Sequence, residues 1–181
     1  AFTTNEAGLT LLHVLDTGTR GVRPVTGLPD GVAAGLKWRS DGRELAVSLT
    51  AGGAPAEAYS IELQTGRIDR WTESELGGIT PSSLSAPSLI RWTAFDQREI
   101  TGFLYQPPAR FTGRRPVIIN IHGGPEAQFR PAFMGRANYY LQELGIALLL
   151  PNVRGSDGYG KTFVGLDNGL KREDSVKDIG A

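Results

Sequence analysis

The feature that most constrains the fold is an apolar segment that leads directly into a glycine-rich turn. Residues 117–121 read Val-Ile-Ile-Asn-Ile, and His122, Gly123, Gly124 and Pro125 follow. A short apolar run of this kind is typical of a strand that is buried on both faces, as in parallel sheets. Two adjacent glycines let the backbone turn sharply where the strand ends. The segment therefore predicts an α/β fold with a site at the carboxyl edge of its sheet.

The residues after this turn predict further alternation of helix and strand. Residues 133–144 carry apolar side chains at helical spacing, and Gly145 is expected to end that helix. A second apolar strand is predicted over 146–150, and after a glycine-rich loop a helix is predicted over 171–181. This order of elements favours a parallel sheet covered by helices on both sides.

The first 86 residues have a different pattern, in which short alternating segments are separated by turn signals. An Asp-Gly turn at Asp41 and Gly42 and a second turn at 64–66 predict hairpins. Evenly spaced hairpins without a helical period suggest a sandwich, or one to two blades of a β-propeller. Residues 77–88 are rich in Gly, Ser and Pro, as linkers between domains are. Beyond them, 89–95 and 99–105 form a further predicted hairpin.

Composition excludes several classes of function. Nineteen basic and nineteen acidic residues cancel, and no basic run exists, so the charge pattern of nucleic-acid or acidic-membrane binding is missing. Cysteine is absent, which removes thiolate chemistry and disulfides. The longest apolar run, 146–150, is too short to span a bilayer. The sequence predicts a soluble protein whose partners are small or peptide-like, without nucleic acid or membrane, and it favours the cytoplasm.

Both ends of the chain read as cut. Residue 1 is Ala, and the predicted helix over 171–181 stops without the Gly or Pro punctuation of a helix end. We therefore expect a fragment. An incomplete sheet would leave apolar edges exposed, and these favour aggregation.

The glycine pair has two interpretations. Backbone N–H groups of Gly123 and Gly124 can approach a reacting oxygen closely and form half of an oxyanion hole, whereas Pro125 has no N–H. Alternatively, the pair is only a tight turn between strand and helix. His122 is expected to orient this loop through its side-chain hydrogen bonds, because a general base would need a nucleophile nearby.

The glycine-rich loop at 151–160 does not supply that nucleophile. Its glycines fit neither a dinucleotide-binding nor a Walker pattern, so no cofactor is predicted. Ser156 lies among glycines, but Arg154 occupies the place of the first glycine in G-x-S-x-G, and no other serine lies in such a motif. His13 and His122 are far apart in sequence and lack a carboxylate cluster, so no metal site is predicted.

Three blocks of sequence together resemble the prolyl oligopeptidase family of serine peptidases, in particular its acylaminoacyl-peptidase-like and dipeptidyl-peptidase-like members. They are Ile121 to Pro125, Pro151 to Lys161, and Lys171 to Ile179. The order and spacing of the blocks match the family. The resemblance covers residues 88–181 well and the first 86 residues only loosely.

This resemblance implies a fold, a division into domains and a set of site residues. Residues 1–86 are expected to be the C-terminal part of a β-propeller, and residues 87–181 the N-terminal part of an α/β-hydrolase domain, truncated before the nucleophile. Gly124 is the expected backbone oxyanion donor, within the loop formed with Gly123 and His122. Several relatives have Tyr in place of His122 and use its hydroxyl. Arg154 and Tyr159 belong to a supporting loop, and Arg154 is expected to pair with carboxylates of the following helix.

The implied function is hydrolysis of short peptides through an acyl-enzyme, with Ser, Asp and His beyond residue 181. The chain alone is therefore expected to be inactive. Two alternatives stay open: an esterase or lipase of the same fold, and a noncatalytic β-propeller interaction module. The sequence predicts neither a residue preference at the cleavage site nor an oligomeric state.

Overall fold

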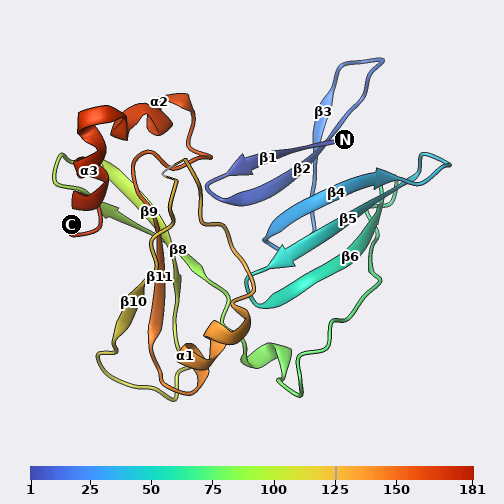
Figure 1. Cartoon of the computed structure of the whole chain (residues 1–181). Coiled ribbons are helices and arrows are strands. Elements are labelled where there is room, and N and C mark those ends of the chain that lie inside the picture. Colours follow the sequence, from blue (N-terminus) through green and yellow to red (C-terminus); the bar gives the residue numbers. More distant parts are fainter. Residues whose placement is uncertain (125) are drawn as a thin grey trace. The chain divides into compact units, whose positions relative to one another are not determined.

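The structure is a computed structural model that describes residues 1–124 and 126–181. Pro125, the last residue of the predicted His-Gly-Gly-Pro turn, lies outside the described residues. The chain divides into two compact units (Figure 1). The first comprises Ala1–Ser82 and Pro131–Phe133, and the second comprises Ser83–Arg130 and Met134–Ala181.

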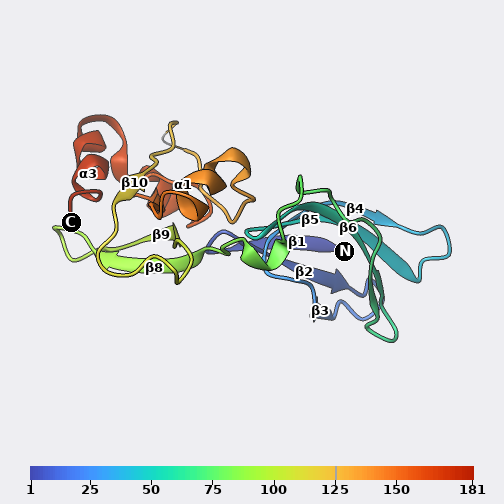
Figure 2. The same cartoon turned by 90° about the horizontal axis from the view of Figure 1, so that it is seen from below.

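The first unit contains two antiparallel sheets, in which the strands follow one another in chain order (Figure 2). The three-stranded sheet consists of β1 (Phe2–Glu6), β2 (Leu9–Leu15) and β3 (Val22–Val25). The four-stranded sheet consists of β4 (Val32–Trp38), β5 (Glu44–Ala51), β6 (Ala54–Glu62) and β7 (Ile68–Arg70). The hairpins predicted at Asp41-Gly42 and at 64–66 are confirmed, and Gly42 has the positive φ of 70° that favours glycine.

The core of the first unit follows the alternation seen in the sequence. Leu45 and Val47 on β5 are buried, while Ala46 and Ser48 between and beyond them are exposed. Leu45 and Val47 pack with Leu12 and Ile61 in one apolar cluster. Period-two burial of this kind is expected when one face of a sheet is covered.

One charged side chain is also buried in this unit. Glu57 on β6 is only 2% exposed. Its carboxylate accepts hydrogen bonds from Arg70, the last residue of β7, and from Thr72 and Ser74 in the segment that follows. Burial alone raises the pKa of Glu57, but the hydrogen bonds from Thr72, Ser74 and Arg70 outweigh it and lower the pKa to about 2. Glu57 therefore ties the segment after β7 to the sheet as an anion.

The second unit is built on a mixed four-stranded sheet with the order β10-β11-β9-β8. Its strands are β8 (Ser88–Thr93), β9 (Glu99–Tyr105), β10 (Val117–Ile119) and β11 (Ala147–Asn152). The predicted hairpin of β8 and β9 is confirmed. Parallel pairing is confined to β10 and β11, because β9 runs antiparallel to β11. The prediction of a parallel sheet therefore holds only for the two apolar strands on which it was based.

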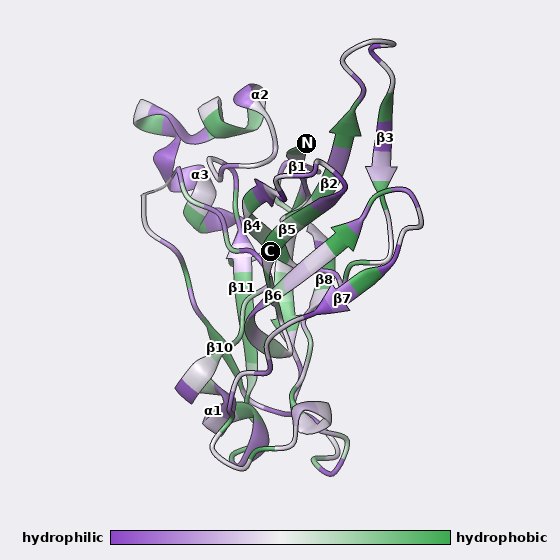
Figure 3. Cartoon of the chain, turned by 90° about the vertical axis from the view of Figure 1, so that its right-hand side faces the viewer, coloured by the Kyte–Doolittle hydropathy of each residue, from purple (hydrophilic) through white to green (hydrophobic). Residues whose placement is uncertain are grey.

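The prediction that both apolar strands are buried is wrong for β10. Val117, Ile118 and Ile119 are 50%, 39% and 43% exposed, and β10 carries hydrophobic residues along its length (Figure 3). The physical reason is position, because β10 lies at the edge of the sheet and pairs only with β11. β11 lies between two strands, and four of its six residues are apolar or proline and buried.

The helices are shorter than predicted. The helix expected over 133–144 is reduced to η2 (Gly135–Ala137) and α1 (Asn138–Gln142), and Gly145 follows with a φ of 60°. Leu141 of α1 is buried against Phe103, Tyr105, Leu148 and Leu150 of the sheet, and this cluster forms the core of the second unit.

The remaining helical segments of the described residues are all short. They are η1 (Pro81–Ser83), α2 (Lys161–Val164), η3 (Gly165–Asp167), η4 (Gly169–Lys171) and α3 (Arg172–Lys177). α3 occupies only part of the helix predicted over 171–181. Within the described residues, no helix has the length and apolar character needed to cross a membrane.

Candidate functional site

The glycine pair lies just beyond the carboxyl end of β10. Gly123 and Gly124 are exposed, and neither backbone N–H has an acceptor among the described residues. Gly124 has a φ of 132°, and a Cβ at this position would lie 2.8 Å from the backbone nitrogen of Glu126. Only glycine fits this position without strain. The backbone donors of the pair are thus available to an external acceptor.

His122 connects this loop to the loop that follows β11. Its Nε2 lies 3.1 Å from Ser156 Oγ, and its Nδ1 lies 3.2 Å from the carbonyl oxygen of Gly123. The ring also meets Phe129 edge-on, with centroids 5.1 Å apart. The side-chain hydrogen bonding expected of His122 is present, and its role in orienting the loop stays a prediction.

Ser156 forms a serine–histidine pair with His122, but its geometry is not that of a nucleophile. The side chain is fully buried. Its Oγ donates its one hydrogen to the carbonyl oxygen of Val153 at 2.7 Å, so it accepts rather than donates toward His122. A nucleophilic serine must be reachable by substrate and must give its proton to the base. The absence of a G-x-S-x-G motif around Ser156 agrees with this geometry.

Asn152 is a residue of this site that the sequence reasoning did not single out. It is fully buried at the end of β11, where its Oδ1 accepts the backbone N–H of Phe129 at 2.7 Å and its Nδ2 donates to the carbonyl oxygen of Phe129 at 2.9 Å. Nδ2 also donates to the hydroxyl of Tyr159 at 3.0 Å, and this hydroxyl lies 2.7 Å from Thr101 Oγ1. The sequence signal that could have identified Asn152 is a polar residue directly after an apolar run. A polar side chain that is buried with its strand needs hydrogen-bond partners.

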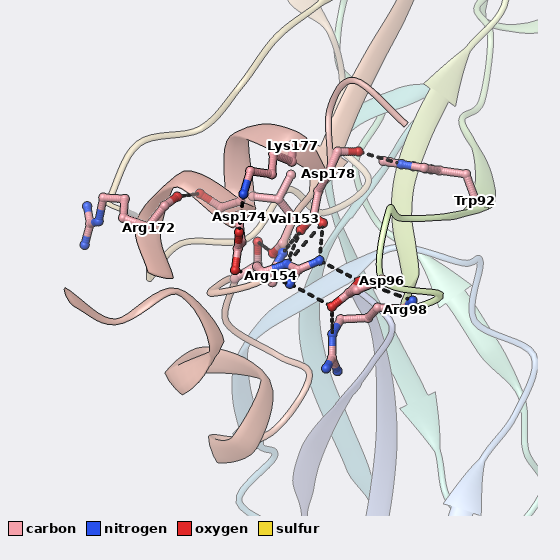
Figure 4. A network of polar contacts seen from close by, with 11 residues as sticks. Trp92, Asp96, Arg98, Val153, Arg154, Arg172, Asp174, Lys177 and Asp178 are labelled. Carbon is pink, nitrogen blue, oxygen red and sulfur yellow. Dashed lines mark hydrogen bonds and ion pairs between the residues drawn. The ribbon is translucent and has the colours of Figure 1, made fainter. Parts of the chain in front are cut away.

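Arg154 lies at the centre of a buried ion-pair network (Figure 4). Its Nε and Nη2 donate to Asp178, with distances of 2.9 Å and 2.6 Å for the shortest contacts. Its Nη1 and Nη2 donate to the two oxygens of Asp96 at 3.0 Å and 2.9 Å, and Asp174 lies 4.0 Å away. The guanidinium also stacks over Phe95, 4.8 Å from the ring centroid.

The pairing predicted between Arg154 and carboxylates of the following helical region is confirmed by these contacts. Hydrogen bonds from Asp178 and Asp96 outweigh burial and raise the pKa of Arg154, and Arg154 in turn lowers the pKa of Asp96. Asp96 was not predicted as a partner, because it lies 58 residues away in the turn between β8 and β9. The network fixes the loop after β11 to that turn and to α3.

The described residues contain no group of three or more His, Asp or Glu side chains that could hold a metal ion. What the arrangement offers chemically is a pair of exposed backbone donors beside a loop whose first residues, Val153 to Ser156, are buried. Donors of this kind stabilise an oxyanion when a nucleophile is supplied close by.

The fold of the chain is shared with solved structures. A solved structure of a puromycin hydrolase superposes with a TM-score of 0.80 and 24% identity, and the match covers 97% of this chain and 27% of that one. This likeness shows the fold. No family model matches the chain.

Sequence relatives then identify the family. The peptidase YuxL of Bacillus subtilis (strain 168) is 31% identical over 147 residues, which are 75% of this chain and 21% of YuxL. Prolyl oligopeptidase A of Amanita bisporigera is 25% identical over 120 residues, 64% of this chain and 16% of that protein. The resemblance to the prolyl oligopeptidase family is thereby confirmed, and the curated homologues of the chain are peptidases. The matched part of the chain spans only 16% to 21% of the length of these two relatives.

Proposed function

We propose that this chain supplies the oxyanion loop of a serine peptidase that hydrolyses short peptides. The observation that carries the proposal is the exposed pair Gly123 and Gly124 at the end of β10, whose N–H groups have no acceptor among the described residues. Homology to peptidases supports this function over an esterase or lipase activity and over a noncatalytic propeller module.

In the proposed reaction, a serine gives its proton to the histidine and attacks the peptide carbonyl. The C–N bond breaks, the amine leaves with that proton, and water then hydrolyses the acyl-enzyme. The Gly124 N–H, assisted by Gly123, stabilises the negative charge on the former carbonyl oxygen, and a second donor follows the nucleophile. Ser, Asp and His of the triad come from sequence beyond residue 181 of the complete protein. Residues 1–86 form the C-terminal part of a propeller domain, and residues 87–181 form the first part of the hydrolase domain.

The other site residues are assigned supporting roles. His122 orients the loop through its hydrogen bond to Ser156, and it does not act as a base, because Ser156 donates its proton elsewhere. Arg154 and Tyr159 hold the loop that follows β11. Arg154 does so through its ion pairs with Asp96 and Asp178, and Tyr159 through its hydrogen bond with the Asn152 amide. No metal or cofactor enters this reaction scheme.

The test compares the 181-residue chain with the complete protein. A fluorophosphonate probe is expected to label the complete protein and to leave the chain alone unlabelled, with boiled protein as the control. The complete protein is expected to cleave peptide p-nitroanilides more efficiently than p-nitrophenyl esters of fatty acids. Heat-sensitive labelling of the chain alone would contradict its proposed inactivity, and cleavage of esters only would favour the esterase alternative.

A further inference from the structure

We propose that Ser156 and Asn152 are positioning residues that hold the oxyanion loop at its two ends. Ser156 contacts His122, immediately before the glycine pair, and Asn152 contacts Phe129, on the far side of it. The inference rests on the proposed oxyanion role of Gly123 and Gly124. It assigns a function to two buried polar side chains that neither carry out the chemistry nor contribute to the apolar core.

The first contact also determines which nitrogen of His122 carries a proton. Ser156 Oγ has one hydrogen, and its 2.7 Å contact with the Val153 carbonyl oxygen uses it. His122 Nε2 must therefore be the donor across the 3.1 Å separation from Ser156 Oγ. The neutral imidazole is therefore held in the Nε2–H form, in which Nδ1 has no proton to donate to the Gly123 carbonyl oxygen 3.2 Å away. The ring plane is fixed further by the edge-on contact with Phe129. Because Gly123 directly follows His122, a fixed ring restricts the start of the glycine pair.

The second contact, between Asn152 and Phe129, satisfies both backbone groups of Phe129, as pairing with a neighbouring strand would. The Asn152 amide both accepts from the Phe129 N–H and donates to its carbonyl oxygen. Asn152 is itself held by the hydroxyl of Tyr159. Since Asn152 is fully buried, loss of its side chain would leave both backbone groups of Phe129 without these partners.

The two contacts come from one rigid source. Asn152 and Ser156 lie on either side of Arg154, which is 3% exposed and bonded to two carboxylates. β10 and β11 are parallel, so the loops that follow them leave the same edge of the sheet. A rigid loop after β11 can therefore immobilise an exposed loop after β10. Donors that are already in place cost no reorganisation when the oxyanion forms, which is the condition for electrostatic catalysis.

The test uses the complete protein with Ser156→Ala and a matched control, Ser175→Ala. Both serines are buried and donate Oγ–H at 2.7 Å to the carbonyl oxygen three residues earlier, but only Ser156 also contacts a histidine. We expect Ser156→Ala to lower kcat about tenfold with KM changed less than about twofold, because loop misplacement acts on the transition state. Ser175→Ala is expected to leave both constants unchanged.

A spectroscopic measurement keeps the test independent of activity. In ¹⁵N-histidine-labelled complete protein, His122 is expected to give the signals of an Nε2-protonated ring, assigned by their loss in His122→Gln. Ser156→Ala is expected to shift these signals, and Ser175→Ala is not. Should Ser156→Ala fail to fold, Ser156→Cys keeps the side-chain shape with weaker hydrogen bonds and is expected to show an intermediate loss of kcat.

The outcomes separate this inference from the proposed function. Fluorophosphonate labelling of the wild-type complete protein together with an unchanged kcat in Ser156→Ala overturns the positioning role alone. An equal fall of kcat in Ser175→Ala also overturns it, since the effect would then be general destabilisation. Failure of the wild-type complete protein to react with the probe overturns both proposals.

Discussion

β10 and β11 are neighbouring apolar strands with the same sequence pattern and opposite environments. Ile118 and Leu148 are partners in the parallel register, yet Ile118 is 39% exposed and Leu148 is 5% exposed. The difference continues past the strand ends, because Gly123 and Gly124 are exposed whereas Arg154 and Ser156 are buried. An apolar pattern therefore indicates a strand, while its neighbours in the sheet decide its burial. In the proposed function, the buried residues after β11 position the exposed loop after β10, and that loop offers its backbone N–H groups to the oxyanion.

The largest expected effect tests whether the loop after β11 is the rigid one. Arg154→Met leaves Asp178 buried without its cation and should reduce the free energy of unfolding by about 3–5 kcal/mol. Arg91→Met, which removes an exposed pair with Glu99, should cost less than about 1 kcal/mol. Urea denaturation of the two variants measures the difference. Equal losses of unfolding free energy in the two variants would contradict the claim that the Arg154 network stabilises the fold more than an exposed ion pair does.

The second prediction compares the two strands at their register partners. Leu148→Ala in the 181-residue chain should reduce the free energy of unfolding by about 3 kcal/mol, because it leaves a cavity in the core formed with Leu141. Ile118→Ala should cost less than about 1 kcal/mol, because much of that side chain is already in water. Denaturation curves at matched protein concentration measure both. A larger loss for Ile118→Ala would show that β10 is covered in solution.

A pH titration extends the contrast to a buried charge in the first unit. The folded-state pKa of Glu57 is about 2, below the ordinary value of 4.5, so its stabilisation is complete above pH 4.5 and is lost as the pH falls toward 2. Glu57→Gln should cost about 2 kcal/mol at pH 7, because the Arg70, Thr72 and Ser74 donors lose an anionic acceptor. The difference between variant and wild type should shrink between pH 4.5 and pH 2. Parallel stability curves over this window would contradict the lowered pKa.

The smallest effect on stability is expected at the exposed edge itself. Ile118→Lys should change the free energy of unfolding by less than about 0.5 kcal/mol. It should reduce self-association of the 181-residue chain, because a charge on an edge strand opposes pairing with another copy. Light scattering during concentration measures the association. Unchanged scattering would show that the chain does not self-associate through β10.

Local features of the fold were predictable because their causes are local. The alternation of Leu45, Val47 and Leu49 predicted a half-buried strand, and Asp41-Gly42 predicted the turn before it. The pairing of Arg154 with the last helical region was also predictable from the resemblance of these segments to the family. Asp174 and Asp178 lie one helical turn apart there.

The features that could not be predicted depend on contacts between distant residues. Nothing in residues 117–121 records that β10 would lie at an edge, and helical spacing over 133–144 did not reveal that α1 would have only five residues. The Asn152 contacts with Phe129 span 23 residues, and the Arg154 contact with Asp96 spans 58. Such pairs become visible only when the sheet order is known.

The central claim is that the exposed glycine pair after β10 binds the oxyanion. The most direct measurement is a crystal structure of the complete protein after reaction with a phosphonate inhibitor that forms a covalent, tetrahedral adduct. The account predicts that an adduct oxygen lies about 2.7–3.1 Å from the backbone nitrogen of Gly124. An adduct whose oxygens are all beyond hydrogen-bonding distance of both Gly123 and Gly124 would contradict it.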